Sequence, residues 1–277
     1  MNLLDKTKLI LKQYEINPLH FRGQNFLISE KILDQIIEIA NLKEKENILE
    51  IGPGIGTLTT AMLDKGINLK VVEVDDKMIK ILEKLKGLYN FEIIKGDILK
   101  IYLEKEFGKD FLSNYRIIAN LPYNITSHFL RIFLEMNNRP TQMILMLQKE
   151  VVERIVVLDK KWSKLSLMCN YYSKPKIEFF VNKNSFFPAP VIDSAIISFS
   201  YIKEPKEKID WKLINFAFSS KRRTLVNNLS AGLKIDKNII EKDILELGFD
   251  KNIRAEKLSL GDWTKLSRFF FKYTPKS

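Results

Sequence analysis

Residues 47–57 read NILEIGPGIGT, and this stretch decides the fold class. Its first five residues form a short apolar run typical of a buried strand, which stops at Gly52, Gly54 and Gly56. Glycines after a first strand allow the backbone to approach a ligand closely at the edge of a sheet. The spacing is not the G-x-G-x-x-G of dinucleotide-binding folds, and no Lys-Ser/Thr pair of a phosphate-binding loop follows. The stretch therefore favours a nucleoside ligand without phosphates, such as S-adenosylmethionine.

Strand-like and helix-like segments alternate around this turn, from about residue 29 to residue 201. The expected strands are residues 47–51, 69–74, 91–94, 116–119 and 143–147, and the expected helices are residues 30–40, 58–63, 77–86, 127–136 and 150–158. Short apolar strands that alternate with helices indicate a parallel, doubly wound α/β sheet. Two further β-rich runs, residues 177–181 and 195–201, have no helix between them and predict an antiparallel pair at one edge of the sheet.

Residues 203–208, KEPKEK, read as a linker, and helical spacing without strand signals follows it. The sequence therefore predicts an α/β domain over residues 1–204 and a small all-α domain over residues 205–277. The single cysteine, Cys169, cannot form an internal disulfide, which favours the reducing cytoplasm. No secretory signal opens the chain, and no run approaches the roughly 18 apolar residues of a membrane span.

The chain of 277 residues carries 45 Lys and Arg against 34 Asp and Glu, a formal charge of +11. Such an excess points to a polyanionic partner, or to a genome that favours lysine on solvated surfaces. Charge alone does not decide between these readings. The hydrophobic fraction of 45% is enough for a buried core, which excludes a disordered chain.

An acidic residue lies at or just after the carboxyl end of each of the next two expected strands. Glu73 lies 21 positions after Gly52, where a carboxylate can accept hydrogen bonds from ribose hydroxyls. Asp97 follows the third strand and could accept a hydrogen bond from an adenine amino group. Either acid alone would most simply be a turn or capping residue. Together with the glycine turn, at the ends of three consecutive strands, they predict a nucleoside site.

The fourth strand ends in residues 120–125, NLPYNI, which predict the chemistry. An exocyclic amine of a base is a poor nucleophile, and acceptors on its hydrogens would push the nitrogen toward tetrahedral geometry. The Asn120 side-chain oxygen and the Leu121 carbonyl could be these acceptors. Pro122 stiffens the turn, and Tyr123 offers a face on which a flipped base can stack. The alternative is a proline turn with an Asn cap and no chemistry.

Several motifs together resemble the bacterial KsgA (RsmA) family of small-subunit rRNA adenine dimethyltransferases, from about His20 to Leu266. They are GQNFL at 23–27, EIGPGIGTLT at 50–59, Glu73, GD at 96–97, NLPYNI at 120–125, LQKEVV at 147–152, FFPAPVIDSA at 186–195, KRRTL at 221–225 and RAEKLS at 254–259. The chain departs from the usual family pattern at His20 and Arg22, where the family opens its first motif with Lys, and in KRRT, where the family usually has RRKT.

The resemblance implies a Rossmann-like, S-adenosylmethionine-dependent methyltransferase sheet with an antiparallel edge, and a helical C-terminal domain that contributes to rRNA binding. It implies that S-adenosylmethionine is held by Asn25, Leu27, Gly52, Gly54, Glu73, Asp97 and Asn120. Catalysis is assigned to Asn120, Leu121, Pro122, Tyr123 and Phe186, with Phe186 facing Tyr123 across the target base. Lys221, Arg222 and Arg223 are expected to contact RNA phosphates.

The implied reaction is dimethylation of two adjacent adenines in the 3′-terminal hairpin loop of 16S rRNA, within an immature 30S subunit and late in its assembly. This reaction needs no metal, and no DNA or membrane partner is expected. We expect a cytoplasmic monomer, because the chain has a single cysteine and no long apolar seam is left unassigned. Two histidines and one cysteine cannot build a histidine-based triad or a zinc site. His128 is expected on a helix surface.

Three alternatives stay open at the level of sequence. An Erm-type large-subunit rRNA methyltransferase shares QNFL, EIG and Pro-Tyr, but Pro53, the ending Asn124-Ile125 and KRRTL disfavour it. A DNA adenine methyltransferase would be expected to carry Asn-Pro-Pro-Tyr and a separate DNA-reading domain. The third alternative is a binding protein that acts as an assembly checkpoint on small subunits, with incidental methylation.

Overall fold

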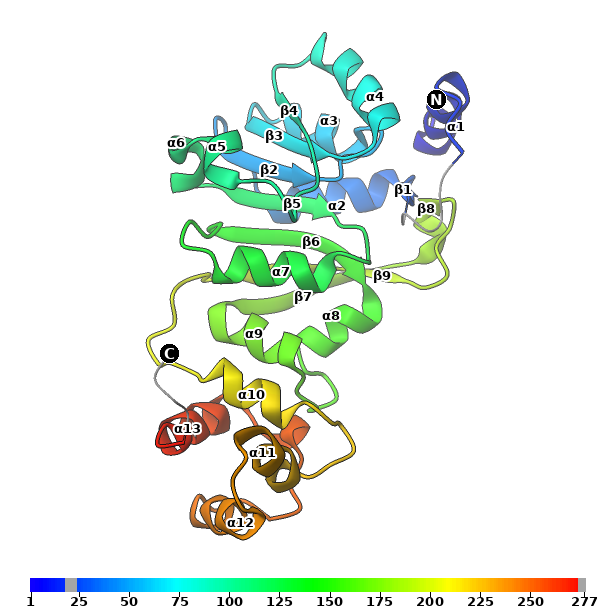
Figure 1. Cartoon of the computed structure of the whole chain (residues 1–277). Helices are drawn as coiled ribbons and strands as arrows, with labels where there is room; N and C mark the ends of the chain where they lie inside the picture. The colour runs from blue at the N-terminus through cyan, green and yellow to red at the C-terminus, as the bar shows by residue number, and fades with distance from the viewer. Residues whose placement is uncertain (18–23, 274–277) are drawn as a thin grey trace. The chain divides into compact units, whose positions relative to one another are not determined.

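The computed structural model describes residues 1–17 and 24–273, so His20 and Arg22 lie outside the described residues (Figure 1). Contacts divide the chain into two compact units. The α/β unit comprises Met1–Val152 and Ser173–Ile202, and the helical unit comprises Glu153–Tyr172 and Lys203–Ser277. Within the described ranges, no helix is long and apolar enough to cross a membrane.

The α/β unit contains a sheet of seven described strands in the order β4-β3-β2-β5-β6-β9-β7 (Figure 1). The strands are β2 (Asn47–Ile51), β3 (Asn68–Glu73), β4 (Glu92–Lys95), β5 (Arg116–Asn120), β6 (Gln142–Gln148), β7 (Lys174–Val181) and β9 (Ser194–Ser200). The pairings from β4 to β6 are parallel, whereas β9 is antiparallel to both β6 and β7. The predicted parallel sheet and its antiparallel edge are confirmed.

Helices cover both faces of this sheet, because successive strand side chains point to opposite sides and both sides are apolar. Helices α2 (Glu30–Ala40), α3 (Thr57–Leu63) and α4 (Asp76–Lys86) share one core with strand residues such as Ile48, Val71 and Ile118. Helix α7 (Thr126–Glu135) lies across the other face (Figure 1). Ser29 caps α2 by accepting a hydrogen bond from the Ile32 amide, as its position before the apolar periodicity predicts.

The remaining elements of this unit are short or peripheral. They are α1 (Leu3–Gln13), α5 (Leu103–Phe107), α6 (Lys109–Ser113), α8 (Lys149–Ile155), which spans the division between the units, a 3₁₀ turn η2 (Lys183–Ser185), and a small antiparallel sheet of β1 (Phe26–Leu27) and β8 (Phe186–Phe187). The pairing of β1 with β8 joins segments about 160 residues apart in the chain. Two-residue strands carry no periodicity, so the sequence did not predict them.

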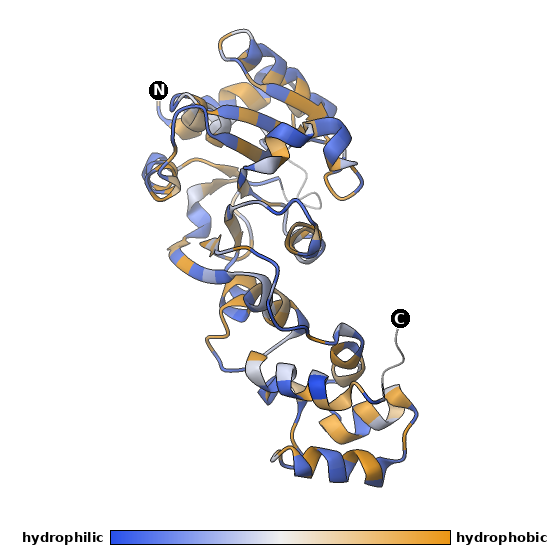
Figure 2. Cartoon of the chain, turned by 90° about the vertical axis from the view of Figure 1, so that its left-hand side faces the viewer, coloured by the Kyte–Doolittle hydropathy of each residue, from blue (hydrophilic) through white to orange (hydrophobic). Residues whose placement is uncertain are grey.

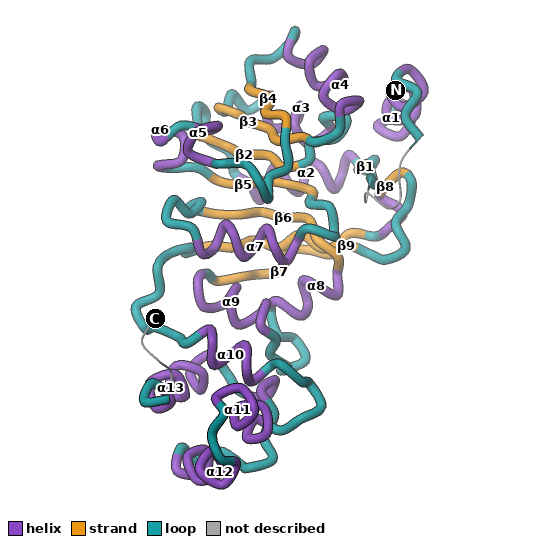
Figure 3. Tube along the Cα trace, in the orientation of Figure 1, coloured by secondary structure: helices purple, strands orange, loops and turns teal. Residues whose placement is uncertain are grey.

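The helical unit contains α9 (Lys164–Tyr172), α10 (Trp211–Ala217), α11 (Leu225–Leu233), α12 (Lys237–Glu246), a 3₁₀ turn η3 (Ala255–Lys257) and α13 (Leu260–Phe270). Residues 203–273 contain helices and loops but no described strand (Figure 3). Alternating hydrophobic and hydrophilic colouring marks its helices as amphipathic (Figure 2). Their apolar sides meet in one core that includes Leu213, Leu229 and Trp263.

Residues 153–172 belong to the helical unit, whereas the sequence predicted them as part of the α/β domain. Leu167 of α9 is fully buried in the same core as Leu213 and Trp263, and Tyr171 packs edge-on against Trp211. The predicted linker correctly marks the boundary near residue 203, where a shift in local composition is visible in the sequence. The earlier segment of the helical unit, residues 153–172, was not predicted, because only its packing with distant residues assigns it to that unit.

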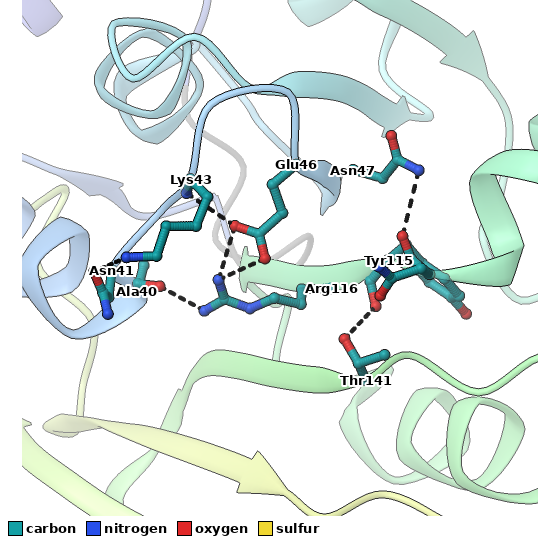
Figure 4. Close-up of polar contacts among 9 residues, drawn as sticks. Ala40, Asn41, Lys43, Glu46, Asn47, Tyr115, Arg116 and Thr141 are labelled. Atoms are coloured by element: carbon teal, nitrogen blue, oxygen red, sulfur yellow. Dashed lines mark hydrogen bonds and ion pairs between the residues drawn. The ribbon is translucent and has the colours of Figure 1, made fainter.

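An ion-pair network ties the amino end of the sheet together (Figure 4). Arg116 begins β5 and donates two hydrogen bonds of 3.0 Å from Nη1 to both carboxylate oxygens of Glu46. Its Nη2 donates to the Ala40 carbonyl, at the end of α2, over 2.6 Å. The side chains of Arg116 and Glu46 are only 12% and 23% exposed. Arg116 therefore joins α2, the turn before β2, and β5 at the edge away from the glycine turn.

Replacing Arg116 by methionine should lower the free energy of unfolding by on the order of 3 kcal/mol, because Glu46 keeps a largely buried charge without its partner. Urea denaturation measures this difference. Arg131→Met is the control, since the pair of Arg131 with Glu135 on α7 is more exposed and should contribute less than about 1 kcal/mol. Equal losses in the two variants would contradict the assignment.

Candidate active site

A pocket lies where β2, β3 and β5 end, at the edge expected for ligands in a parallel sheet. Its walls come from the segment before α2, the glycine turn after β2, the end of β3 with the start of α4, and the turn after β5. Seven of the predicted site residues line it, namely Asn25, Leu27, Gly52, Gly54, Glu73, Asn120 and Pro122. The structure thus brings most of the predicted donor site together.

Glu73 is the acidic residue of the pocket that is held most rigidly. Its Oε1 accepts hydrogen bonds from the Val74 and Asp75 amides at 2.8 and 2.9 Å, and its Oε2 accepts one from Gly54 at 3.2 Å. Burial raises the pKa of Glu73, and these three amides oppose that shift. The carboxylate thereby fixes the glycine turn to the end of β3.

Gly54 and Gly56 lack a side chain for different structural reasons. Gly54 has φ +57°, and a Cβ there would come within 3.3 Å of the Phe26 ring, which also lines the pocket. Gly56 has φ +84° and precedes α3, and a Cβ there would overlap the side chain of Leu85 in α4. Gly54 thus keeps the pocket wall close, whereas Gly56 serves the packing of two helices. This explains why the third glycine need not follow the dinucleotide spacing.

Glu50 also lines the pocket, although no role was predicted for it within the motif EIGPGIGTLT. The residue is 2% exposed, and its Oε2 accepts a hydrogen bond of 2.7 Å from the Thr59 hydroxyl on α3. Burial raises the pKa of Glu50 to about 8, with a further increase from the Glu73 charge and a decrease from Thr59. Glu50 is therefore a buried carboxylic acid that stays protonated at neutral pH, unlike an ordinary glutamate.

The segment Gln24–Leu27 crosses the pocket and is fixed at two points. Gln24 Nε2 donates a hydrogen bond of 3.1 Å to Asp75 Oδ2, at the start of α4. Asn120 Nδ2 donates one of 3.4 Å to the Asn25 carbonyl. Gln24 and Asp75 line the pocket but were not predicted as site residues. The GQNFL motif contained Gln24, and the position of Asp75 two residues after Glu73 was the signal for the second.

The turn after β5 presents Asn120 to the pocket. Its Nδ2 donates to the Asn25 carbonyl, whereas its side-chain oxygen can only accept hydrogen bonds. The Leu121 amide donates to the Met146 carbonyl of β6 at 3.3 Å, and the Ile125 amide donates to the Pro122 carbonyl at 3.2 Å. The turn is thus anchored to β6 and closed on itself, so Asn120 has a fixed position.

Four predicted residues do not line this pocket, namely Asp97, Leu121, Tyr123 and Phe186. Asp97 Oδ1 accepts a hydrogen bond of 3.0 Å from the Leu99 amide, in the turn after β4. The Phe186 side chain is 3% exposed and packs in the core that includes Leu27. Tyr123 is half-buried, and its hydroxyl shares a hydrogen bond of 2.9 Å with Ser194. The predicted ligand contacts of Asp97, Tyr123 and Phe186 stay predictions.

The predicted RNA-contact residues Lys221, Arg222 and Arg223 are all exposed, immediately before α11 of the helical unit. His128 is exposed on α7, as expected for a helix-surface residue. Among the described residues, no group of three or more His, Cys, Asp or Glu side chains could hold a metal ion. Burial raises the pKa of the Cys169 thiol, so this cysteine is a packing residue rather than a nucleophile.

Comparison with known proteins assigns the chain to a family. Residues 19–272 match the family described as ribosomal RNA adenine dimethylase. The chain belongs to the ribosomal RNA adenine dimethylase family. Ribosomal RNA small subunit methyltransferase A of Dehalococcoides mccartyi (strain CBDB1) is 38% identical, over 96% of this chain and 92% of the relative. The protein of the same name from Alkaliphilus oremlandii is 36% identical, over 95% of each chain.

Two solved structures extend the comparison to the fold. A dimethyladenosine transferase from Plasmodium falciparum superposes with a TM-score of 0.73 at 27% identity, over 90% of this chain and 98% of that structure. The 23S rRNA methyltransferase ErmE superposes with a TM-score of 0.68 at 22% identity, over 88% of this chain and 99% of that structure. The second likeness concerns the fold alone.

Membership in the dimethylase family confirms the predicted class, an S-adenosylmethionine-dependent rRNA adenine dimethyltransferase. The curated relatives favour the small subunit over the Erm-type alternative and confirm 16S adenine dimethylation as the predicted reaction. The Rossmann-like sheet with a helical C-terminal region is confirmed as well.

Proposed function

We propose that the chain dimethylates two adjacent adenines in the 3′-terminal hairpin loop of 16S rRNA, within an immature 30S subunit late in its assembly. The observation that carries this proposal is the fixed Asn120 turn beside a pocket that contains the buried carboxylate of Glu73. A cytoplasmic monomer without a metal ion is part of the same proposal.

The pocket residues fit S-adenosylmethionine. The carboxylate of Glu73 lies 21 residues after Gly52, in the position from which it can accept hydrogen bonds from both ribose hydroxyls. Gly52 and Gly54 leave room for a ligand against the backbone, and we assign Asn25 and Leu27 to the side that the N-terminal segment covers. Asp97 would contact the adenine. When bound, this donor supplies an activated methyl group on a sulfonium and leaves as S-adenosylhomocysteine, while the methylated amine releases one proton to solvent.

The residues of this chain then position the target amine. We assign the Asn120 side-chain oxygen and the Leu121 carbonyl as acceptors of its two hydrogens, which directs the nitrogen lone pair toward the methyl group. Tyr123 and Phe186 would hold the flipped base between them, with Pro122 stiffening the turn. Catalysis here depends on alignment and on the placement of acceptors rather than on a strong base. The same arrangement must accept unmethylated and monomethylated amines.

An assay with three substrates tests this function. The protein is incubated with labelled S-adenosylmethionine and, separately, undermethylated small subunits, large subunits or duplex DNA, and the modified base is then mapped. Dimethyladenine confined to the 3′-terminal hairpin loop of the small-subunit RNA is the expected result. Label in large-subunit RNA or in DNA would contradict the proposal.

The helical unit is the proposed RNA-docking part, because it carries most of the excess charge. It contains 21 basic and 12 acidic residues, a net charge of +9, whereas the α/β unit contains 24 and 22, a net charge of +2. A polyanionic partner thus explains the distribution better than a uniform lysine bias would, since a bias of the genome should affect both units alike.

Three basic segments of this unit meet in space. The Leu225 amide, just after Lys221–Arg223, donates to the Ile253 carbonyl at 2.7 Å, and the Trp162 amide donates to the Glu256 carbonyl at 2.8 Å. Besides Lys221–Arg223, the exposed basic residues of these segments are Lys160, Lys161, Lys251, Arg254 and Lys257. A cluster of this kind fits an RNA backbone better than a single helix face would.

Neutralising Lys221, Arg222 and Arg223 together to glutamine should weaken binding to small-subunit RNA and flatten its salt dependence. The slope of log K against log salt should fall by about 0.7–0.9 for each lost phosphate contact. Filter binding over a salt series measures this. The matched control replaces Lys234, Lys237 and Lys242, which are exposed in the same unit around α12. An unchanged slope in the first variant would mean that Lys221, Arg222 and Arg223 do not contact phosphates and belong to an ordinary solvated surface.

A further inference from the structure

The hydroxyls of Tyr123 and Ser194 form a hydrogen bond, and neither residue lines the donor pocket. They lie 2.9 Å apart and 71 residues apart in the chain. Ser194 is fully buried at the start of β9, and Tyr123 is half-buried in the turn after β5. Because β6 lies between β5 and β9 in the sheet, the Tyr123 side chain spans the carboxyl end of β6.

Ser194 is a fixed anchor for this bond. It pairs with Gln148 of β6 on one side and with Val181 of β7 on the other. Its neighbour Asp193 accepts a hydrogen bond of 3.0 Å from the Lys149 amide through its carbonyl, and one of 2.9 Å from the Lys183 amide through its side chain. The Ser194 backbone therefore cannot shift without disturbing its pairing with two strands, so the point at which the hydroxyl is attached is fixed.

Tyr123 is consequently held at both ends. Its backbone belongs to the turn that the hydrogen bond from Ile125 to Pro122 closes, and its phenol is bound to Ser194. Burial raises the pKa of Tyr123, while the bond with Ser194 lowers it. The phenol stays neutral at neutral pH, so the bond joins two neutral hydroxyls and restricts how the ring can tilt.

We propose that Ser194 is a positioning residue for methyl transfer, which acts through the Tyr123 hydroxyl to fix the angle of the ring on which the target adenine stacks. This inference rests on the proposed function, in which Tyr123 carries the base. Ser194 itself touches no reactant and moves no proton. A tilted ring would still bind the base by stacking, but it would misalign the amine with the methyl group, so the rate suffers more than binding does.

A double-mutant cycle tests the hydrogen bond between Tyr123 and Ser194, which we call the tether, with Ser194→Ala, Tyr123→Phe and the double variant. One hydrogen bond corresponds to about a 5- to 10-fold effect, so each single variant should lower kcat for undermethylated small subunits by that factor. The double variant should be no slower than the slower single variant, since both changes remove the same bond. The KM for the donor should not change, because neither side chain lines the donor pocket.

Ser198→Ala is the matched control. Ser198 lies on the same strand, is 6% exposed, and donates a hydrogen bond of 2.6 Å to Glu178, away from Tyr123. This variant should keep a normal kcat even if it loses stability. Tyr123→Phe keeps the ring and changes a half-buried side chain, so it tests the tether even if Ser194→Ala folds poorly.

Three outcomes would overturn the inference: a normal kcat in Ser194→Ala, single effects that multiply in the double variant, or an equal loss in Ser198→Ala. Failure of the proposed function looks different. In that case the wild-type chain itself would leave the small-subunit adenines unmodified, whereas failure of the tether leaves wild-type transfer intact.

Discussion

Replacing Asn120 by alanine should lower kcat for methyl transfer by about 10²- to 10³-fold and leave binding to small subunits nearly unchanged. The target amine has its lone pair delocalised into the ring, so it needs acceptors on its hydrogens to become nucleophilic. Asn120 Nδ2 donates to the Asn25 carbonyl, and the side-chain oxygen is the acceptor that alanine removes. Steady-state kinetics with undermethylated small subunits measures the rate, and sedimentation measures binding.

Two further variants sharpen this test. Asn120→Asp keeps an acceptor oxygen but loses the donor to Asn25, so it should retain more activity than Asn120→Ala. Asn124→Ala changes an exposed residue four positions later and should stay within about threefold of the wild type. A normal rate in Asn120→Ala would show that this residue is not central. Intact binding with lost transfer would also separate catalysis from an assembly-checkpoint role.

The sheet could be predicted from the sequence because its signals are local. Each strand is a short apolar run, and the glycine turn, Glu73 and Asn120 all follow strands that end at the same edge. Parallel strands bring such positions together whatever the intervening helices contain. The pairing of β1 with β8 and the packing of α9 with the helical unit depend on contacts between distant segments, and no local pattern encodes them.

The residues that carry the predicted reaction could be named from the sequence, but the properties of Glu50 and Ser194 could not. Glu50 belongs to the glycine motif, yet only the structure shows that it is buried, bound to Thr59 and close enough to Glu73 for the two carboxyl groups to interact electrostatically. Ser194 likewise stood in a motif without an assigned role. Its contact with Tyr123 requires knowing that β9 lies next to β6. Burial and strand order, rather than residue identity, determine what these two residues can do.

Glu50→Gln should remove a pH dependence from the stability of the α/β unit. The folded chain holds a proton on Glu50 up to about pH 8, whereas the unfolded chain loses it near the ordinary value of 4.5. Between these pH values the folded state binds the extra proton, so the free energy of unfolding falls as pH rises. Glutamine is neutral throughout and can still accept the Thr59 hydrogen bond. Relative to the wild type, the variant should gain on the order of a few kcal/mol between pH 5 and pH 8.

Urea denaturation of both chains at intervals between pH 5 and pH 8 measures this gain. Thr59→Val gives a second, opposite test, because the Thr59 hydroxyl lowers the pKa of Glu50 by binding its carboxylate. Without that bond the pKa should rise further, and the fall in stability should extend to higher pH than in the wild type. Parallel stability curves for wild type and Glu50→Gln would mean that Glu50 is ionised in the folded chain. In that case Glu50 would add a further negative charge beside Glu73 in the pocket.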